Sequence, residues 1–505
     1  MRVLLYNFVQ PEEPGAGGVG VYLNNLAKAL VKDHDVILLS SGDRYSPRQR
    51  EPRVEFSEDA YHRAVVINSP VLAPAAYSFG DPDIYLTSKD LDFIPALLAE
   101  KYGKIDVFHF QNIEGLTKSF FVTLRQVFPD AQIVYSVHNY HPVCPRVSLW
   151  YQDRVVCTDY RDGVGCTMCL APIFDPNYIR ARRRLMALEE SYPRAMAIVS
   201  PLVSLAKRGR RLLLKVRQKA DVIEAPTSAA LSSSQSGASS ASYADFRKSN
   251  IALFEDVFDR VLAVSKRTGQ VIIDRGVPAH KVSVSYIGTA HKSTYLTSTK
   301  IRDIGSGLHL GYIGYMGTDK GFNFLLECLE KIPADVAAEV TVTIAAKNTF
   351  PERRARMENL APRFKALRYF DGYTHSNLDM VLSGVNLGLI PVLWEDNLPQ
   401  TAIELVSRGI PILTSDRGGA QEIAHNPKFI FKSGEHDAFV DQVCRISRRE
   451  LELNEFWDRD MNVFSMDEHV EDLMRHYRKD DRWTADPYQA GGEMDAVAGV
   501  GGLAG

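Results

Sequence analysis

The stretch PVLWEDNLPQTAIELVSRGIPILTSDRGGAQEI, residues 391–423, carries the most informative pattern in the chain. An apolar run ends at residue 392, a helical pattern begins at 399, a second apolar run covers 410–415, and a glycine pair follows at 418–419. Short apolar runs that alternate with helical patterns are typical of parallel βαβ units. Ligands bind at the carboxyl ends of the strands in such sheets, so the loop after residue 392 is a candidate site.

The same alternation occurs in two separate series. The first predicts strands at 2–8, 35–40, 105–110, 131–137 and 260–265, with a helix at 19–33; the second predicts strands at 309–315, 340–346, 367–373, 385–392 and 410–415, with helices at 323–332 and from 399. Apolar periodicity is lost near 290–307. We therefore predict an α/β chain of two doubly wound, Rossmann-like domains, residues 1–295 and 305–475, that face a central cleft.

Composition narrows the class of protein. The chain has 505 residues, of which 45% are hydrophobic and 24% charged, and a formal net charge of −3. These values are those of a globular protein and exclude an overall basic, nucleic-acid-binding surface. No apolar run approaches the roughly 18–20 residues of a membrane-spanning helix, and the N-terminus lacks a signal-peptide pattern, so we expect a cytoplasmic protein.

Three segments stand apart from the two series. Residues 180–219 hold twelve Lys or Arg against two Glu. This basic segment predicts either a solvated helical face or a peripheral contact with an anionic membrane or a lipid-linked acceptor. Residues 227–242 are rich in serine and predict a flexible loop, and 484–505 are rich in glycine and alanine and predict a disordered tail.

The loop and helix at 393–406 place two carboxylates together. Asp396 and Glu404 are eight residues apart, one in the loop after a strand and one on the helix that follows. Carboxylates at such a junction bind sugar or ribose hydroxyls by charge-assisted hydrogen bonds. The backbone amides of Asn397 and Leu398 open the helix towards an anion.

A glycine-rich loop follows the first predicted strand of each of the two domains. In GAGGVG, residues 15–20, Gly17 and Gly18 permit close approach of a ligand to the backbone; with Asp43 the loop also fits a dinucleotide site, although the spacing is poor. In GYIGYMGTDKG, residues 311–321, Lys320 beside a helix N-terminus suits a phosphate or diphosphate, and the alternative is a surface lysine in a turn.

A histidine motif occupies the middle of the first domain. In SVHNYHPVCP, residues 136–145, His138 ends a strand and is expected to project into the cleft, with His141 three residues later. A lone histidine is more often structural than catalytic, so both interpretations stay open on local grounds.

Taken in order, these motifs resemble a retaining glycosyltransferase of family 4 with the GT-B fold, over roughly residues 1–475. The resemblance implies a nucleotide-diphosphate sugar donor on the C-terminal domain and a glycan or lipid-linked acceptor on the N-terminal domain, in polysaccharide or glycoconjugate biosynthesis. It implies no cofactor for catalysis. It assigns catalytic roles to His138, Asp396 and Lys320, and donor-binding roles to Gly17, Gly18, Lys320, Asn397, Leu398 and Glu404.

The chain departs from the family pattern at several positions. Tyr315 stands where many members carry an arginine that helps to hold the diphosphate, and Arg417 is a candidate replacement. Asp396 replaces a glutamate and Asn139 replaces a frequent aspartate. These departures keep two alternatives open: a non-catalytic nucleotide-sugar-binding protein, or another GT-B enzyme such as a nucleotide-sugar epimerase.

Four of the six cysteines are clustered. Cys144, Cys157, Cys166 and Cys169 lie within 26 residues, and the last two form a CxxC pair. In a cytoplasmic protein such a cluster predicts a structural zinc site, and the alternative is a set of buried thiols.

Overall fold

The computed structural model describes residues 1–13, 17–77, 82–169, 176–192, 238–295, 298–458 and 463–478. The predicted tail at 484–505, most of the serine-rich loop and residues 193–219 of the basic segment lie outside these described residues. Within them, no helix is long and apolar enough to cross a membrane.

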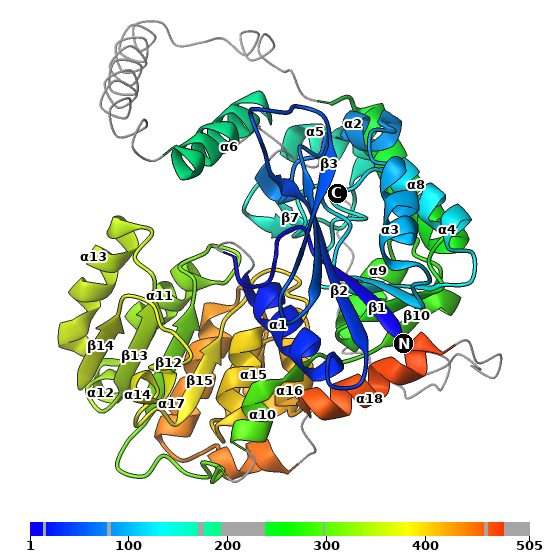
Figure 1. Ribbon diagram of the computed structural model, residues 1–505. Coiled ribbons are helices and arrows are strands. Elements are labelled where there is room, and N and C mark those ends of the chain that lie inside the picture. The colour runs from blue at the N-terminus through cyan, green and yellow to red at the C-terminus, as the bar shows by residue number, and fades with distance from the viewer. Residues whose placement is uncertain are drawn as a thin grey trace, which may run out of the picture.

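The first domain is built on an eight-stranded sheet (Figure 1). Its strands, in spatial order, are β10 (Val282–Val284), β9 (Arg260–Ala263), β6 (Gln132–Val137), β5 (Val107–Phe110), β1 (Arg2–Tyr6), β2 (Asp35–Arg44), β4 (His62–Ile67) and β3 (Arg53–Glu58). All neighbours pair in parallel except β3 and β4. Strands β1, β5 and β6 are buried almost completely, as a sheet covered by helices on both faces requires.

Helices connect these strands. They are α1 (Gly17–Leu30), α2 (Pro82–Thr87), α3 (Phe93–Tyr102), α4 (Lys118–Val127), α5 (Val164–Cys169), α6 (Pro176–Ser191), α8 (Ser240–Asp256) and α9 (Lys266–Ile273). A small hairpin, β7 (Trp150–Tyr151) and β8 (Val155–Val156), lies in the long connection after β6. Helix α1 buries Tyr22, Leu23, Leu26 and Leu30 at helical spacing, which is why the predicted helix forms there.

The second domain contains a six-stranded, wholly parallel sheet. Its order is β14 (Ala366–Phe370), β13 (Thr341–Ala346), β12 (His309–Gly314), β15 (Leu387–Ile390), β16 (Ile412–Ser415) and β17 (Ile430–Phe431). The helices are α11 (Phe322–Lys331), α12 (Ala334–Ala337), α13 (Pro351–Leu360), α14 (Leu378–Val381), α15 (Gln400–Ser407), α16 (Ala420–Ala424) and α17 (His436–Ser447). The strand order reverses between β12 and β15, and such a switch point is where doubly wound sheets bind ligands.

The chain crosses between the domains twice, and the crossings lie side by side. The first holds β11 (Gly288–Thr289) and α10 (Ala290–Thr294); the second holds β18 (Phe464–Ser465) and α18 (Met466–Tyr477). Strand β11 pairs with β18. Helix α18 then packs against α1 of the first domain, as Figure 1 shows. The second domain therefore ends with a helix that lies on the first.

Candidate active site

Lys320 and Asp396 meet at the switch point of the second sheet. Lys320 follows β12 and Asp396 follows β15, and the Lys320 Nζ lies 2.6 Å from the Asp396 Oδ2. The ammonium also lies 5.0 Å from the centre of the Trp394 ring. Burial acts to lower the pKa of Lys320, but the carboxylates of Asp396 and Asp319 outweigh it, and the pKa is raised. Lys320 is thus a fixed positive charge at the site.

Two glycines hold these loops in place. Gly321 has φ +73°, and a Cβ there would lie 1.7 Å from the Pro391 carbonyl oxygen. Gly418 has φ +64°, and a Cβ there would lie 1.9 Å from the Asp396 carbonyl oxygen. Only glycine fits such a left-handed position pressed against backbone. The glycines after Lys320 and after β16 therefore position the ion pair from both sides.

The residues after Asp396 join the second domain to the first. The Asn397 carbonyl oxygen accepts hydrogen bonds from the hydroxyls of Ser265, at 2.9 Å, and Thr268, at 3.0 Å. The Asn397 side chain donates to the Val137 carbonyl oxygen at 3.3 Å. Among the described residues, the backbone N–H groups of Asn397 and Leu398 have no partner in the protein. They remain available to an anion at the start of α15.

His138 comes from the first domain, directly after β6. Its Nε2 donates to the Gln111 Oε1 at 2.9 Å, and its ring lies 4.9 Å from the ring of Tyr22 on α1. Burial, assisted by His469, lowers the pKa of His138 to about 3. The imidazole is neutral at physiological pH, with Nδ1 as an acceptor. His141, by contrast, is buried against Phe246 and is a core residue.

The start of α1 lies with His138 on the side of the site that the first domain contributes, the first-domain wall. Gly17 has φ +58°, and a Cβ on Gly18 would lie 3.2 Å from the Gln400 Cγ at the start of α15. The two helix N-termini from opposite domains therefore approach each other. The structure thus gathers the predicted glycines, His138, Lys320 and the 396–398 loop around the contact between the domains.

Glu404 lies one turn further along α15 and is 4% exposed. Its Oε2 accepts a hydrogen bond from the Tyr373 hydroxyl at 3.1 Å. Burial raises the pKa of Glu404 to about 7, although Tyr373 and Arg408 act in the opposite direction. The carboxyl group is therefore poorly compensated, and its Oε1 accepts no hydrogen bond from a described residue.

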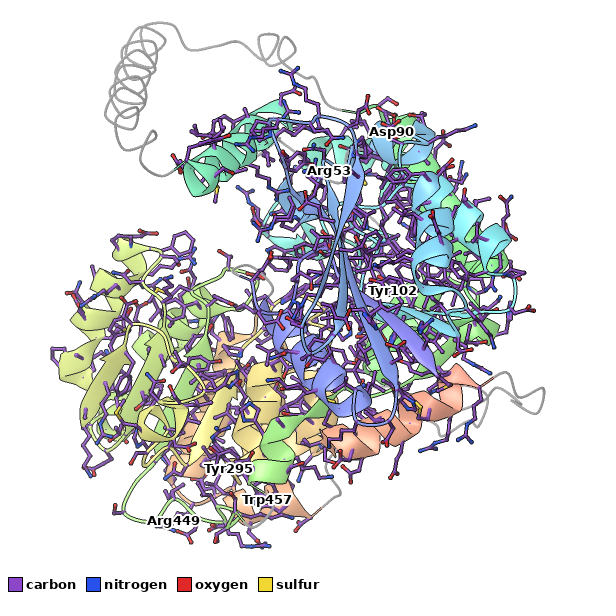
Figure 2. The ribbon with its side chains drawn as sticks, in the orientation of Figure 1. Arg53, Asp90, Tyr102, Tyr295, Arg449 and Trp457 are labelled. Atoms are coloured by element: carbon purple, nitrogen blue, oxygen red, sulfur yellow. The ribbon has the colours of Figure 1, made fainter. Side chains whose placement is uncertain are left out.

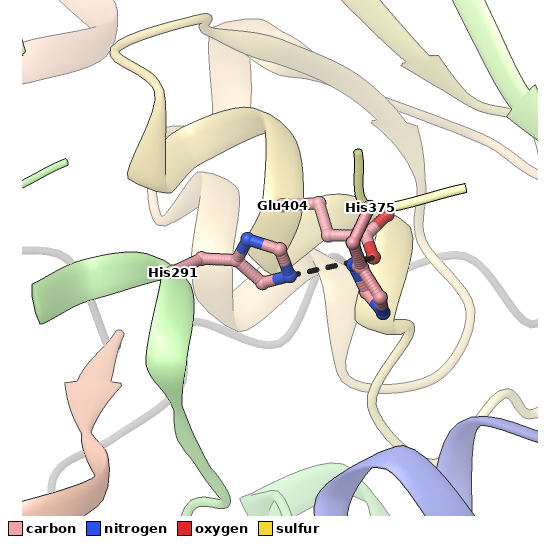
Figure 3. Close-up of side chains that lie close together, drawn as sticks. All are labelled: His291, His375 and Glu404. Carbon is pink, nitrogen blue, oxygen red and sulfur yellow. Dashed lines mark ion pairs between the residues drawn. The ribbon is translucent and has the colours of Figure 1, made fainter. Parts of the chain in front are cut away.

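Two histidines that the sequence analysis missed lie beside this carboxylate (Figure 3). The Glu404 Oε1 is 3.6 Å from the His291 Nε2 and 3.9 Å from the His375 Nδ1. These atoms could surround a metal ion, but Arg408 donates to the His291 Nδ1 at 3.2 Å. Since guanidinium only donates, the neutral ring carries its proton on Nε2, the atom that faces Glu404. This favours a polar ligand over a cation.

Arg408 is itself held by the linker between the domains. It donates to the Tyr295 hydroxyl at 2.9 Å and to the Asp379 carboxylate at 2.8 Å. Tyr295 follows α10 near the base of the second domain in Figure 2. No local motif marks His291 or His375, because their meeting depends on how the linker packs against α15.

Glu395 was also missed, although it adjoins Asp396. It is 1% exposed and pairs with Arg267 of the first domain at 2.5 Å and with Arg417 at 3.1 Å. Burial acts to raise the pKa of Glu395, but Arg267 outweighs it and the pKa is lowered. Arg417, the suggested substitute for the missing arginine, is therefore engaged by Glu395. Tyr315 is 66% exposed and supplies no charge.

Described parts of the basic segment have structural partners. Arg183 donates to the Gly42 carbonyl oxygen at 2.6 Å and pairs with Asp43 at 3.0 Å, and Arg180 donates to the Pro70 carbonyl oxygen at 2.8 Å. Asp43 is thus paired with an arginine, which removes the residue that a dinucleotide site would use for a ribose. These two arginines attach α6 to the first domain.

Comparison with known proteins identifies the architecture. Residues 307–449 match the family model of glycosyl transferases group 1. Among solved structures, Anabaena HepE in complex with UDP is similar at a TM-score of 0.51 and 12% identity, over 94% of this chain and 99% of that one. Sucrose-phosphate synthase from Thermosynechococcus elongatus gives 0.53 and 15%, over 95% and 98%. The fold is GT-B.

A third structure agrees with this assignment. It is the UDP-forming α,α-trehalose-phosphate synthase from Burkholderia xenovorans in complex with glucose-6-phosphate, at a TM-score of 0.53 and 13% identity, over 94% of this chain and all of that one. A search of curated proteins gave no match. At these identities the solved structures confirm the predicted GT-B fold, and the matched segment of the second domain contains Lys320, Asp396 and Glu404.

Proposed function

We propose that this protein is a retaining glycosyltransferase of family 4 that moves a sugar from a nucleotide-diphosphate donor to a glycan or other sugar-containing acceptor. The observation that carries the proposal is the Lys320–Asp396 ion pair at the switch point of the second sheet, together with the buried, poorly compensated Glu404 on the helix that follows Asp396. The match of residues 307–449 to glycosyl transferases group 1 supports it.

The donor would lie across the switch point. Its diphosphate would receive the Lys320 ammonium and the open amides of Asn397 and Leu398, which are fixed donors of the kind that stabilise a leaving anion. Asp396 neutralises Lys320 at 2.6 Å in the free chain. A bound diphosphate would take over that contact and release the Asp396 carboxylate to the sugar hydroxyls.

The ribose would lie beside Glu404. A carboxylate accepts hydrogen bonds from two adjacent hydroxyls, and the free Oε1 together with His291 and His375 offers further polar contacts. Two of the similar solved structures contain UDP or are named UDP-forming, so uridine nucleotides are the first donors to test.

The acceptor would lie against the first domain, between the start of α1 and His138. Transfer with retention on one face of the sugar requires no protein nucleophile. The neutral imidazole of His138 would then serve as a hydrogen-bonding group beside the reacting sugar, and charge on the leaving group would be carried by Lys320 and the amides. Such an enzyme would use a cytoplasmic nucleotide-sugar donor in the synthesis of a polysaccharide or glycoconjugate. Its acceptor would be a glycan or a lipid-linked sugar.

A binding screen followed by product analysis tests the proposal. UDP, GDP, ADP, dTDP and CMP, each with its common sugars, are added to the purified protein, and thermal stability is measured. A selective rise with one nucleoside diphosphate, followed by transfer that keeps the anomeric configuration by NMR, is expected. A folded protein that no nucleotide stabilises would contradict it.

A second candidate function is a nucleotide-sugar-binding protein without turnover. The specific observation in its favour is that Tyr315 supplies no charge and that Arg417 is bound to Glu395, so Lys320 faces the diphosphate without the usual second cation. Selective donor binding without transfer or donor hydrolysis, for a panel of acceptors, would support this alternative.

A further inference from the structure

The connection between β6 and α6 is unusually irregular. It contains a hairpin of two-residue strands, a 3₁₀ turn and the six-residue α5. Six of the nine non-glycine residues with positive φ in the described chain fall here: Val147, Leu149, Gln152, Asp153, Arg161 and Asp162. Such conformations are costly, and β-branched Val147 is a clear outlier. They persist only where something else holds the backbone in place.

Four thiols from separate parts of this connection converge. Cys144 lies in the turn after β6, Cys157 follows the hairpin, and Cys166 and Cys169 lie on α5. The Val147 N–H donates to the Cys144 carbonyl oxygen at 2.8 Å and the Cys157 N–H donates to the Leu149 carbonyl oxygen at 2.7 Å, so Cys157 lies beside the turn that holds Cys144. None forms a disulfide, and all four are half-buried.

A backbone amide points at one of these sulfurs. The Gln152 N–H, in the turn of the hairpin, donates to the Cys169 Sγ at 3.4 Å. An N–H···S hydrogen bond of this kind orients a sulfur atom that can ligate a metal.

Arginines surround the same group. The Arg146 Nη1 is 3.8 Å from the Cys169 Sγ, Arg247 interacts with Cys157 and Cys166, and Arg275 interacts with Cys157 and donates to its carbonyl oxygen at 2.7 Å. Four thiolates around one divalent cation leave a net charge of −2. Three guanidinium groups at the rim would balance that charge.

We propose that Cys144, Cys157, Cys166 and Cys169 bind one structural zinc ion in a closed, tetrahedral site. Binding releases four protons and forms four zinc–sulfur bonds of about 2.3 Å. Among the described residues, three potential ligand atoms already lie within 4.8 Å of one another at His291, His375 and Glu404. No three of the four cysteine sulfur atoms, all of which the structure describes, lie that close together. Binding of the ion would therefore require the cysteine side chains to move towards one another.

The ion would fix the segment that begins at His138. Asn139 donates to the Glu114 carboxylate at 2.7 Å, and the turn closes through the Tyr140 N–H to the Val147 carbonyl oxygen at 2.9 Å. Cys144 lies inside this turn. Zinc would therefore stabilise the first-domain wall of the cleft without touching the donor, and the proposal stands independently of the reaction that the cleft performs.

Metal content of the full-length, untagged protein tests the proposal. Purified from zinc-supplemented cells, the protein is expected to hold about one zinc per chain by elemental analysis, and the Cys166→Ser and Cys169→Ser variants well under half of that. Cys444→Ala, which alters a buried thiol outside the cluster, is the matched control and should keep its zinc. Metal content is the better readout, because burial raises the pKa of Cys166 to about 12 and makes its thiol slow to react in any case.

If a serine variant fails to fold, cobalt binding to the wild-type protein provides a second test. Reduced wild-type protein is stripped of metal and titrated with Co²⁺, which should give the visible and near-ultraviolet absorption of tetrahedral cobalt thiolate at one equivalent, and Cys169→His should bind cobalt with a shifted spectrum. Less than about 0.2 zinc per chain together with no thiolate absorption would overturn the proposal. Equal zinc in the wild type and in both serine variants would also overturn it.

Discussion

Glu404→Gln separates the charge of the proposed ribose contact from its shape. Glutamine keeps the size of the side chain and can still accept the hydrogen bond from Tyr373, but it cannot ionise. Burial raises the pKa of Glu404 to about 7, so the wild-type carboxyl is mostly neutral about one pH unit below that value and mostly ionised one unit above it. The variant and the wild type should therefore differ in a pH-dependent way.

The size of the effect follows from the two kinds of hydrogen bond. A bond to a charged group contributes about 1.5–3 kcal/mol and a neutral one about 0.5–1.5 kcal/mol, so losing the charge should weaken donor binding about tenfold. We expect that loss at about pH 8, and little difference at about pH 6, where wild-type Glu404 is already protonated. Wild-type affinity should rise with pH across this interval, and that of the variant should stay flat.

The substitution should have the opposite effect on folding stability: it weakens donor binding at alkaline pH but stabilises the folded protein there. The pKa of Glu404 is higher in the folded state than in the unfolded chain, so the wild type loses stability as pH rises from the unfolded value through about 7. Glu404→Gln escapes this loss, which is at most about 3 kcal/mol on the alkaline side. The variant should therefore melt at a higher temperature than the wild type at about pH 8 and at nearly the same temperature at about pH 4, below the pKa of the unfolded chain.

Calorimetric titration with UDP-glucose measures the predicted difference in donor affinity between the wild type and the variant. Its diphosphate is esterified at both ends and does not titrate in this range, so the pH dependence reports the protein. A tenfold loss at both pH values, or no loss at either, would refute the assigned role. Higher thermal stability of the variant at alkaline pH would show that weaker binding does not come from misfolding.

Three further changes test other parts of the structure. Lys320→Gln should lower kcat by roughly 10²–10³ and affect donor affinity much less, since its charge matters most as the diphosphate leaves; equal losses in kcat and in UDP-glucose affinity would point to ground-state binding alone. Burial lowers the pKa of His141 to about 3 and both its ring nitrogens lack a described partner, so the wild type should lose stability as pH falls below about 6.5, and His141→Phe should reduce that loss in pH-dependent thermal melts; parallel melting curves would contradict this. Tyr477→Phe removes the hydroxyl that contacts the His109 Nδ1 at 2.7 Å and should cost about 1–2 kcal/mol in urea unfolding, whereas an unchanged midpoint would show that this hydrogen bond contributes nothing to the docking of α18.

Local patterns predicted the central strands of both sheets, but not β3, β4 and β10 of the first sheet or β17 of the second. The strand predicted at 131–137 is β6, Gln132–Val137, and the helix predicted from 399 is α15, Gln400–Ser407. Both succeed because a buried parallel strand is a continuous apolar run and an amphipathic helix repeats every 3.6 residues. Lys320 and Asp396 could be predicted to lie close together because each is in the loop that follows a strand, and Glu404 because it is on the helix after Asp396.

Contacts made by distant segments could not be predicted. His291 meets Glu404 because α10 of the linker packs on α15, and His375 reaches the same carboxylate from the loop after β14. No local pattern distinguishes Glu395 from the residues around it. Its ion pair with Arg267, at a separation of 128 residues, depends on the docking of the two domains, and no short motif encodes that.

The double crossing and the loop after Asp396 join the two domains on either side of the site. Strands β11 and β18 and the Tyr22–His469 hydrogen bond, at 2.7 Å, hold the domains along one edge, and the Asn397 carbonyl oxygen holds them next to Asp396. Gly18 at the start of α1 faces α15, and a Cβ there would lie 3.2 Å from the Gln400 Cγ. An alanine at this position would therefore require the Gln400 side chain to shift by a few tenths of an ångström, because the two domains are fixed by these other contacts.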